Sequence, residues 1–396
     1  MEGFEIAPNI YWVGAVDWNV RSFHGFQTPR GATYNAYLIL DDKVTLIDAV
    51  KAPFVDELKA RVSHYVDPSQ IDVVVSNHVE PDHSSGLPAV MQWAPDAPLY
   101  CSARGEAGLK KHYGEGWNFK TVETGDEISL GRYTLSFILT PMLHWPDSMM
   151  TYLKEEQVLF SMDGFGQHIA STERFAADLG LAQTLAEART YWANILMPLG
   201  RIAVGALGAL KDVPVTTICP SHGVMWREHI PQIIEAYRRW ATHQVERKAV
   251  VVFASMWHST EKMAVAIAEG LRRAGVQTRV FDLTETDVTP IISEIQEAAA
   301  IVVGSSTLNQ TCLPKCGQFL TYLRGLKPEG RMGAIFGSYG WSRGAEAAIR
   351  KDLEATKIDL PLNDLLVNFV PTPDDLATCE DYGLEIARQI DDRLAG

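Results

Sequence analysis

Six consecutive residues carry two imidazoles and two carboxylates, on His78, Glu80, Asp82 and His83. The apolar run at 71–75 comes directly before them and predicts a buried strand. Imidazole nitrogens and carboxylate oxygens are ligands for transition metals. Loops that leave the carboxyl end of a strand are where α/β folds place their chemistry. The stretch therefore predicts a metal site on such a loop.

Three more candidate ligands stand on short loops that each follow an apolar strand, namely His144, Asp163 and His222. Together the seven residues supply four imidazoles and three carboxylates, enough for two metal ions with one carboxylate shared. Asp48 stands at the end of a further strand, on a fifth loop. Pro81 and the turn at 84–86 predict that the first loop stays out of regular structure, so that its side chains converge.

A single histidine on a loop is more often a structural residue than a ligand. Here the clustering of ligand types on successive loops favours a metal site. The first loop resembles that of the metallo-β-lactamase superfamily, whose binuclear zinc hydrolases carry His-x-His-x-Asp-His there. This chain has Glu80 in place of the second histidine. Because a hard, negative oxygen ligand favours iron over zinc, we expect a redox-active diiron centre.

The composition excludes several classes of protein. A chain of 396 residues is too long for one ordinary core and predicts two domains. Its 35 basic and 49 acidic residues give a net charge of −14, which argues against a nucleic-acid partner. We expect no membrane segment, because no apolar run approaches the roughly 20 residues that span a bilayer. The N-terminus lacks the basic start and apolar core of a signal peptide, so we predict a cytoplasmic protein.

The five cysteines are Cys101, Cys219, Cys312, Cys316 and Cys379. Their small, odd number argues against a disulfide framework and fits a reducing cytoplasm. Cys312 and Cys316 have C-x3-C spacing, which is not that of zinc ribbons or thioredoxin-like motifs. We predict that the cysteines are inert thiols.

The first part of the chain is rich in short strands. We expect them at 11–13, 35–40, 44–48, 73–76, 119–122, 133–139, 149–153 and 158–161, with helices at about 52–65, 85–93 and 103–112. Two longer helical segments at about 172–210 and a strand at 215–219 follow. A strand-rich region with helices outside it favours an αββα sandwich, so we predict a metallo-β-lactamase-like domain at 1–246.

After a polar helical connector at 228–247 the pattern becomes regular. Strands expected at 249–254, 278–282, 300–304, 331–336 and 365–369 alternate with helices. Such alternation implies right-handed parallel crossovers and a doubly wound sheet of flavodoxin type. We therefore predict an α/β chain whose second domain, 247–396, is flavodoxin-like.

Three loops at strand ends of the second domain could hold a phosphate and a flat ring. The first opens a helix, where backbone amides and the helix dipole attract an anion. It comprises Ser255, Met256, Trp257, His258, Ser259 and Thr260. The other two comprise Ser305, Ser306, Thr307, Leu308 and Asn309, and Ser338, Tyr339, Gly340 and Trp341.

The second domain contains no Gly-x-Gly-x-x-Gly and no Gly-Lys-Thr, so neither a dinucleotide nor a P-loop nucleotide is favoured. The monophosphate of FMN fits a loop rich in hydroxyl groups. Gly340 would let the backbone approach the ring edge, and Trp341 or Tyr339 could stack on the ring. Ordinary turns with Trp341 in the core are the alternative, but three such loops at one sheet end favour FMN.

The combined motifs resemble those of the flavodiiron proteins, which join a metallo-β-lactamase-like domain to a flavodoxin-like one. The motifs are His78-x-Glu80-x-Asp82-His83, Leu143-His144-Trp145-Pro146-Asp147-Ser148, Asp163-Gly164-Phe165-Gly166-Gln167-His168, Ser221-His222-Gly223 and residues 255–260. The resemblance implies one iron held by His78, Glu80 and His144. It implies a second iron held by Asp82, His83 and His222, with Asp163 bridging. In some members the imidazole that matches His83 lies away from the iron.

The resemblance also implies reduction of dioxygen to water, of nitric oxide to nitrous oxide, or both. We expect no appended rubredoxin or flavin-reductase domain, so the resemblance implies electrons from a separate carrier such as rubredoxin. A head-to-tail homodimer, or a tetramer, would bring one subunit's flavin beside its partner's irons. His24 and Tyr191 resemble residues beside the ligands that donate protons or hydrogen bonds, and an ordinary structural role is the alternative for both. His168 and His258 are weaker candidates.

Two other functions stay open. A binuclear zinc hydrolase could carry a flavodoxin-like module for docking, or an electron-transfer protein could carry a vestigial metal site. Two irons per chain and a yellow colour would support the redox function. Tight zinc with thioester or phosphodiester hydrolysis would support the hydrolase instead.

Overall fold

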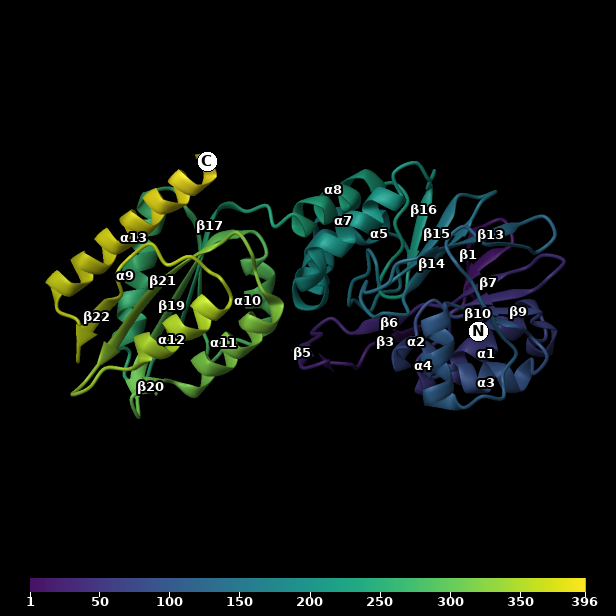
Figure 1. Cartoon of the computed structure of the whole chain (residues 1–396), viewed down its shortest axis with the longest axis horizontal. Helices are drawn as coiled ribbons and strands as arrows, with labels where there is room; N and C mark the ends of the chain where they lie inside the picture. The colour runs from purple at the N-terminus through teal and green to yellow at the C-terminus, as the bar shows by residue number, and fades with distance from the viewer. Residues whose placement is uncertain (396) are drawn as a thin grey trace. The chain divides into compact units, whose positions relative to one another are not determined.

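The computed structural model describes residues 1–395 and is shown in Figure 1. Packing divides the chain into two compact units, which are described separately. The first comprises Met1–Tyr191 and Arg201–Arg238. The second comprises Trp192–Gly200 and the chain from Arg239 onward. The short segment Trp192–Gly200 belongs to the second unit because Ala193 and Met197 lie in that unit's core.

A seven-stranded sheet forms the first layer of strands in the N-terminal unit, in the order β1-β2-β7-β8-β9-β10-β11. These strands are β1 (Phe4–Ala7), β2 (Ile10–Trp12), β7 (Tyr37–Ile39), β8 (Thr45–Ile47), β9 (Val73–Val75), β10 (Leu99–Cys101) and β11 (Phe119–Thr121). Strands β8 to β11 are parallel neighbours. Parallel strands end at one edge of a sheet, so the loop after β9 leaves at that edge.

A five-stranded sheet packs on the first, in the order β12-β13-β14-β15-β16. Its strands are β12 (Glu127–Ser129), β13 (Thr134–Leu139), β14 (Met149–Leu153), β15 (Val158–Met162) and β16 (Thr217–Pro220). Val75 of the first sheet shares a core with Phe137 and Phe160 of the second. Two small ribbons stand apart: β3 (Ala15–Asp17) with β6 (Ala32–Tyr34), and β4 (Ser22–Phe23) with β5 (Phe26–Gln27).

Helices cover the outer faces of the two sheets. On the first sheet lie α1 (Val55–Tyr65), α3 (Leu87–Trp93) and α4 (Ala103–Tyr113), whose Leu58, Val90 and Leu109 share a core with the sheet. On the other side, α5 (Ala176–Leu179), α7 (Gly200–Ala209) and α8 (Ile230–Ala241) are drawn near β14 to β16 in Figure 1. The predicted αββα layering is confirmed.

Three details of the predicted elements are wrong. Residues Pro81–Ser84 form a short helix, α2, because proline at the first helical position pre-sets the helical backbone angle. The two long helices expected at 172–210 are interrupted after α5 by Gly180, at a φ of +100°, and after α6 (Leu181–Tyr191) by π and 3-10 turns that contain Pro198. The connector helix ends at Ala241, and Glu246 already begins a strand.

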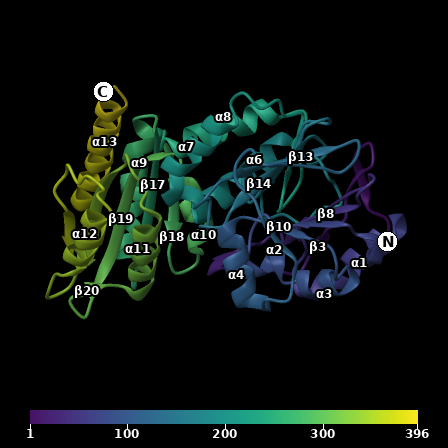
Figure 2. The same cartoon turned by 45° about the vertical axis from the view of Figure 1, so that its right-hand side comes forward.

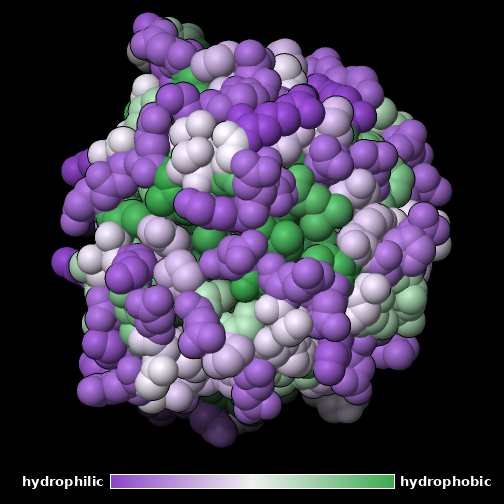
Figure 3. All heavy atoms as spheres, turned by 90° about the vertical axis from the view of Figure 1, so that its right-hand side faces the viewer, coloured by the Kyte–Doolittle hydropathy of each residue, from purple (hydrophilic) through white to green (hydrophobic). Residues whose placement is uncertain are grey.

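The run Leu181–Ala209, 29 residues long, is apolar enough to cross a membrane by length and composition alone, although π and 3-10 turns follow Tyr191 within it. The finding is weak evidence of a span, because core helices of proteins that stay in water pass the same test. On the face of the molecule in Figure 3, hydrophilic side chains cover most of the surface and apolar residues appear between them.

The C-terminal unit has a parallel sheet in the order β18-β17-β19-β21-β22. The strands are β17 (Glu246–Ala254), β18 (Gln277–Asp282), β19 (Ala298–Leu308), β21 (Met332–Tyr339) and β22 (Leu365–Asn368). In chain order this is 2-1-3-4-5, the flavodoxin arrangement that was predicted. A short strand that was not predicted, β20 (Thr311–Cys312), pairs antiparallel with the end of β19.

Helices cover both faces of this sheet (Figures 1 and 2). On one face, α9 (Ser259–Arg273) and α13 (Pro373–Ala395) bury Ile267 and Ile386 against the strands. On the other face, α10 (Val288–Ile295), α11 (Pro314–Leu326) and α12 (Ala345–Ala355) bury side chains such as Phe319 and Ile349. Because both faces are covered, the central strands read as unbroken apolar runs.

Candidate metal centre and ligand pocket

The seven predicted ligands come from loops at strand ends of the N-terminal unit. His78 and Glu80 follow β9, and Asp82 and His83 lie on α2. His144 stands between β13 and β14, Asp163 follows β15, and His222 follows β16. All are buried except His144, whose side chain keeps 14% of its surface exposed. The fold therefore brings four segments that are distant in sequence to one place.

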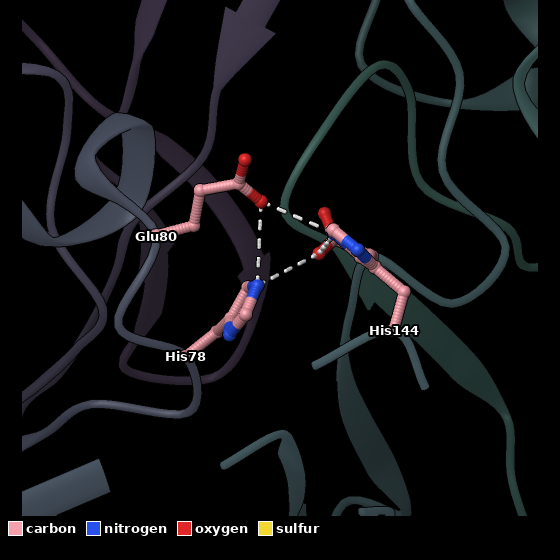
Figure 4. Close-up of side chains that lie close together, drawn as sticks. His78, Glu80 and His144 are labelled. Atoms are coloured by element: carbon pink, nitrogen blue, oxygen red, sulfur yellow. Dashed lines mark ion pairs between the residues drawn. The ribbon is translucent and has the colours of Figure 1, made fainter. Parts of the chain in front are cut away.

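One cluster contains His78, Glu80 and His144, whose polar groups point toward one another in Figure 4, together with Asp163. His144 Nε2 lies 3.1 Å from Glu80 Oε2 and 3.2 Å from Asp163 Oδ2. His78 Nε2 lies 3.4 Å from Glu80 Oε2 and 3.7 Å from Asp163 Oδ2. Two imidazole nitrogens and two carboxylate oxygens that face one point make a set of donors suited to a transition metal.

The other cluster contains Asp82, His83 and His222. The Nε2 atoms of His222 and His83 lie 3.1 Å and 3.4 Å from Asp82 Oδ2. They also lie 3.6 Å and 3.4 Å from Asp163 Oδ1. Asp163 therefore directs one oxygen to each cluster, which is the geometry of a bridging carboxylate.

Several polar atoms in the two clusters are buried without a hydrogen-bond partner. They are both carboxylate oxygens of Asp82, both ring nitrogens of His83, Nε2 of His78 and Oδ2 of Asp163. Leaving such groups unpaired costs about 1–3 kcal/mol each in a folded protein. Because His78 Nε2, His83 Nε2, Asp82 Oδ2 and Asp163 Oδ2 each lie against other donors of the clusters, the donor set fits two metal ions.

The pKa values of the clustered groups reflect close contact between opposite charges. Burial opposes the charge on His78, but its contact with Asp147 and the nearby Glu80 carboxylate raise its pKa to about 9. The carboxylates around His83 and His144 likewise overcome burial and raise their pKa values to about 9 and about 10. Burial opposes the charge on Asp163, yet neighbouring imidazoles hold its pKa well below the usual value. Without a metal, the imidazoles of His78, His83 and His144 therefore stay protonated at neutral pH.

Other contacts orient the imidazoles. Asp147 Oδ2 lies 2.9 Å from His78 Nδ1 and accepts a hydrogen bond from the backbone amide of Val79. The Nδ1 of His222 lies 2.6 Å from the Thr33 carbonyl oxygen. Each ring thus presents Nε2 to the cluster, since partners on the far nitrogen fix the orientation of a metal-binding imidazole.

Asp48, on the fifth loop singled out in the sequence, does not join either cluster. Its carboxylate accepts hydrogen bonds from the backbone amide and the side-chain amide of Asn77, at 2.7 Å and 2.8 Å. Burial raises its pKa, although these hydrogen bonds oppose the shift. Asp48 therefore anchors the residue before His78.

The structure places His24 and Tyr191 beside the ligands. His24 lies in the turn between β4 and β5, with Nε2 2.8 Å from Glu80 Oε1. This hydrogen bond, opposed by partial burial, raises the His24 pKa. The Tyr191 hydroxyl donates to Asp163 Oδ1 at 2.8 Å and is buried. Each side chain holds a carboxylate of the clusters.

His168, which sequence reasoning ranked low, also lies at this site. Its ring centroid is 4.9 Å from those of His222, Tyr191 and Phe23. Both of its ring nitrogens are buried without a hydrogen-bond partner. Burial and the nearby His222 hold its pKa well below 6.5, so the ring is neutral. The motif from Asp163 to His168 was part of the family resemblance, but nothing in it distinguished His168 from a residue that only packs in the core.

A pocket of about 660 Å³ opens at the carboxyl end of the C-terminal sheet. Eleven predicted residues line it: Met256, Trp257, Ser259, Ser306, Thr307, Leu308, Asn309, Ser338, Tyr339, Gly340 and Trp341. Four predicted residues, Ser255, His258, Thr260 and Ser305, are not part of its lining. The lining also includes Gln310, at the end of the second predicted loop, and Ser342, Phe369 and Val370, which were missed. The last two follow β22, so the same strand-end reasoning could have found them.

Two of the predicted residues outside the lining support the wall instead. Thr260 Oγ1 lies 2.9 Å from Ser306 Oγ and 2.8 Å from Ser338 Oγ, so hydroxyls from three loops meet. Ser305 Oγ accepts a hydrogen bond from the Leu313 amide. His258 points away, toward Glu261 at 2.6 Å.

The pocket suits a phosphate and a flat apolar ring. Ser255 Oγ, four residues before the first residue of α9, is buried without a hydrogen-bond partner. A helix N-terminus with such a hydroxyl attracts an anion. At the pocket mouth, Trp257 is 85% exposed and Trp341 is 94% exposed, so the alternative that Trp341 is a core residue is wrong. Two exposed indoles beside a pocket offer faces for stacking.

Comparison with known proteins gives matches along nearly the whole chain. Residues 32–223 match the family described as ODP family beta lactamase, and residues 251–383 match Flavodoxin. A nitric oxide reductase from Moorella thermoacetica is 45% identical over 98% of both chains. The structure of rubredoxin oxygen:oxidoreductase from Desulfovibrio gigas is similar over 100% of both chains, with 36% identity and a TM-score of 0.97.

A solved structure from Giardia intestinalis, called a flavodiiron protein, is similar over 99% of this chain and 98% of its own. It has 34% identity and a TM-score of 0.97. Together with the two domain matches, this degree of identity over full length confirms the family that the motifs indicated. The chain belongs to the flavodiiron protein family.

Proposed function

We propose that this chain reduces dioxygen to water, nitric oxide to nitrous oxide, or both, at a diiron centre that receives electrons through FMN. The observation that carries the proposal is the position of Asp163, whose Oδ2 faces one cluster and whose Oδ1 faces the other. A shared carboxylate suits two metal ions that act on one small substrate. The names of the relatives, a nitric oxide reductase and a rubredoxin oxygen:oxidoreductase, support both substrates.

In this proposal His78, Glu80 and His144 would hold one iron, Asp82, His83 and His222 would hold the other, and the two would share Asp163. Glu80 supports iron over zinc, because it supplies a hard, negative oxygen where binuclear zinc hydrolases have an imidazole. When bound, the iron ions would supply a template for both substrate atoms and the electrons for reduction, and FMN would supply further electrons.

The protein's own residues prepare the site for that chemistry. Tyr191 donates to Asp163 and so fixes the direction of the shared carboxylate. His24 holds the Glu80 oxygen that faces away from the cluster, and its side chain keeps 49% of its surface exposed. A group with contact both to a carboxylate of the site and to solvent is placed to pass protons inward. We assign this role to His24 and the positioning role to Tyr191.

We propose that the C-terminal pocket binds FMN. The N-terminus of α9, with the unpaired Ser255 hydroxyl, would hold the phosphate. Trp257 and Trp341 would flank the ring, and the hydroxyls of Thr260, Ser306 and Ser338 would keep the three loops together. The domains in this proposal are 1–246 and 247–396, and the family matches at 32–223 and 251–383 support that division.

We further propose a separate electron carrier, such as rubredoxin, and a head-to-tail homodimer in a reducing cytoplasm. The metal ligands and the pocket belong to different units of the chain, and an isologous two-fold pairing is the simplest closed way to bring a flavin to a metal centre. All five cysteines are buried free thiols, which suits a reducing compartment. Gel filtration with scattering should show a dimer, and an active monomer would contradict this part.

The test is anaerobic reduction by a rubredoxin, followed by separate assays of dioxygen and nitric oxide consumption. We expect two irons and one FMN per chain, and consumption of at least one of the two gases. Asp163→Asn should abolish consumption and lower the iron content, whereas Asp96→Asn, at an exposed position, should change neither. Tight zinc with hydrolysis of thioesters or phosphodiesters would show a hydrolase instead.

A further inference from the structure

Ser102 lies where three parts of the N-terminal unit meet. It follows β10, precedes α4 and is buried. Strand β10 pairs in parallel with β9, the strand that leads to His78, and the Ser76 amide donates to the Tyr100 carbonyl at 2.9 Å. Because parallel strands end at one edge of a sheet, Ser102 stands at the same edge as the loop that carries His78 and Glu80.

The Ser102 hydroxyl both accepts and donates a hydrogen bond. Ser102 is the N-cap of α4, and its oxygen accepts from the Gly105 amide at 2.9 Å. The same hydroxyl donates its proton to the Asp147 backbone carbonyl at 2.7 Å. A Cβ on Gly105 would lie 3.2 Å from the hydroxyl oxygen, so glycine leaves room for these contacts. Ser102 thereby joins the start of α4 to the loop between β13 and β14.

From Asp147 the contacts continue to a candidate metal ligand. Asp147 Oδ2 lies 2.9 Å from His78 Nδ1 and accepts from the Val79 amide at 2.8 Å. On the other side of the ring, His78 Nε2 lies 3.4 Å from Glu80 Oε2. Asp147 is buried, so its backbone carbonyl needs a partner within the protein, and Ser102 supplies one. The position of the Asp147 backbone in turn determines where its carboxylate meets His78.

We propose that Ser102 is a positioning residue of the metal centre, which holds Asp147 and, through Asp147, the imidazole of His78. The inference rests on the proposed metal centre and adds a residue from the start of α4, a helix that carries none of the seven candidate ligands. Partners on the far nitrogen of an imidazole fix its direction and raise its affinity for a metal. Capping of α4 requires only the hydroxyl oxygen, whereas positioning requires the proton that is donated to Asp147.

Two substitutions separate these roles of the hydroxyl. Glycine is nearly as good an N-cap as serine, but it has no hydroxyl to donate. Ser102→Gly should therefore keep α4 and lower the affinity of the full-length chain for Co²⁺ about threefold or more, measured by competition with a chelator. Ser102→Thr keeps the hydroxyl and should bind Co²⁺ like the natural chain. Failure of threonine to restore the affinity that glycine loses would overturn the proposal.

Asp287→Ala is the matched control for the loss of a helix cap. Asp287 is the N-cap of α10 in the C-terminal unit, and its carboxylate accepts from the Thr289 amide at 2.9 Å. Alanine is a poor N-cap, so this variant should lower stability toward urea at least as much as Ser102→Gly does. Its affinity for Co²⁺ should stay unchanged. Equal losses of Co²⁺ affinity in the two variants would mean that lost stability alone explains the effect of Ser102→Gly.

A double-mutant cycle tests whether Ser102 acts through Asp147. Asp147→Asn keeps the backbone carbonyl that Ser102 contacts and loses the carboxylate charge beside His78. Ser102→Gly should therefore change the Co²⁺ affinity much less in the Asp147→Asn chain than in the natural chain. Equal effects in the two chains, or natural affinity in Ser102→Gly, would overturn this inference alone. A natural chain that binds neither Co²⁺ nor iron would overturn the proposed metal centre as well.

Discussion

At the scale of single residues, Glu80 has the largest chemical consequence. It supplies a carboxylate to a cluster that otherwise contains His78, His144 and one oxygen of Asp163. We predict that Glu80→His lowers the ratio of bound iron to zinc roughly tenfold, because an imidazole restores the donor set of a zinc site. Metal analysis of protein from cells supplied with both ions measures this ratio. Glu80→Gln, which keeps an oxygen but loses the charge, should weaken the binding of both ions, and an unchanged ratio in Glu80→His would contradict the expectation.

His168 offers a second test at the same scale. Its two ring nitrogens have no hydrogen-bond partner and are buried among Phe23, Phe26 and Tyr191. The imidazole therefore lowers the stability of the metal-free folded chain. We predict that His168→Phe raises the free energy of unfolding of the chelator-treated chain by about 1 kcal/mol or more. Urea unfolding measures the change. His168→Gln, which keeps polar atoms there, should bring no gain, and a loss of stability in the phenylalanine variant would mean that the ring has a structural partner.

The sequence was informative about ligand residues because their chemistry is visible in residue type. All seven predicted ligands lie in the two clusters. Residues that orient the ligands were harder to predict, because the sequence does not show which side chains are in contact. Asp48 and Asp147 are both carboxylates near strand ends, yet one anchors Asn77 and the other holds His78. Only the fold decides between such roles.

At the scale of elements, the loop between β13 and β14 connects two parts of the site. It carries His144 as a candidate ligand, and its Asp147 reaches the imidazole of His78 on a different loop. We predict that Asp147→Asn lowers metal affinity about tenfold or more, because the variant keeps an acceptor for the Val79 amide but loses the charge that orients His78. Competition with a chelator measures the affinity.

Asp96→Asn is the matched control for that variant, since Asp96 is exposed. It should bind metal like the natural chain. Equal affinity in the Asp147→Asn chain would mean that the His78 ring is held by its surroundings alone. A loss of folded protein in circular dichroism would point to the Val79 amide rather than to the metal.

Long apolar runs predicted their elements well, whereas short elements did not show in the sequence. The five strands of the C-terminal sheet lie within a few residues of their predicted positions, because β17 and β19 are buried on both faces. Strands of two or three residues, such as β4, β5 and β20, exist through pairing with a neighbour and have no pattern of their own. The helix α2 was missed because Pro81 reads equally well as a turn residue and as a first helical residue.

At the scale of the whole molecule, the ionisation of the clustered imidazoles and carboxylates makes the stability of the chelator-treated chain depend on pH. His78, His83 and His144 have pKa values raised from 6.5 to about 9, 9 and 10 in the folded chain. A raised histidine pKa contributes stability that is fully present below pH 6.5 and is lost as the pH rises through the folded value. The depressed pKa of Asp163 contributes stability above pH 3.8 that is lost in acid.

We therefore predict that the chelator-treated chain is most stable between about pH 4 and 6.5 and loses stability steadily toward pH 10. Denaturant unfolding followed by tryptophan fluorescence at several pH values checks the trend. The metal-loaded chain should show the opposite dependence in this range, since protons compete with metal for the imidazoles. A chelated chain that gains stability from pH 6.5 to 9 would contradict the assignment of charged imidazoles.

The two oxygens of Asp163 face different clusters, and from this we expect the two metal ions to bind cooperatively. An ion bound at one cluster would orient the shared carboxylate and displace protons from the neighbouring imidazoles. The second ion would then meet ligands that are already ordered and carry less positive charge. Titration of the stripped chain with ferrous ion should then pass from empty to doubly filled, with singly filled chains scarce at every intermediate ratio.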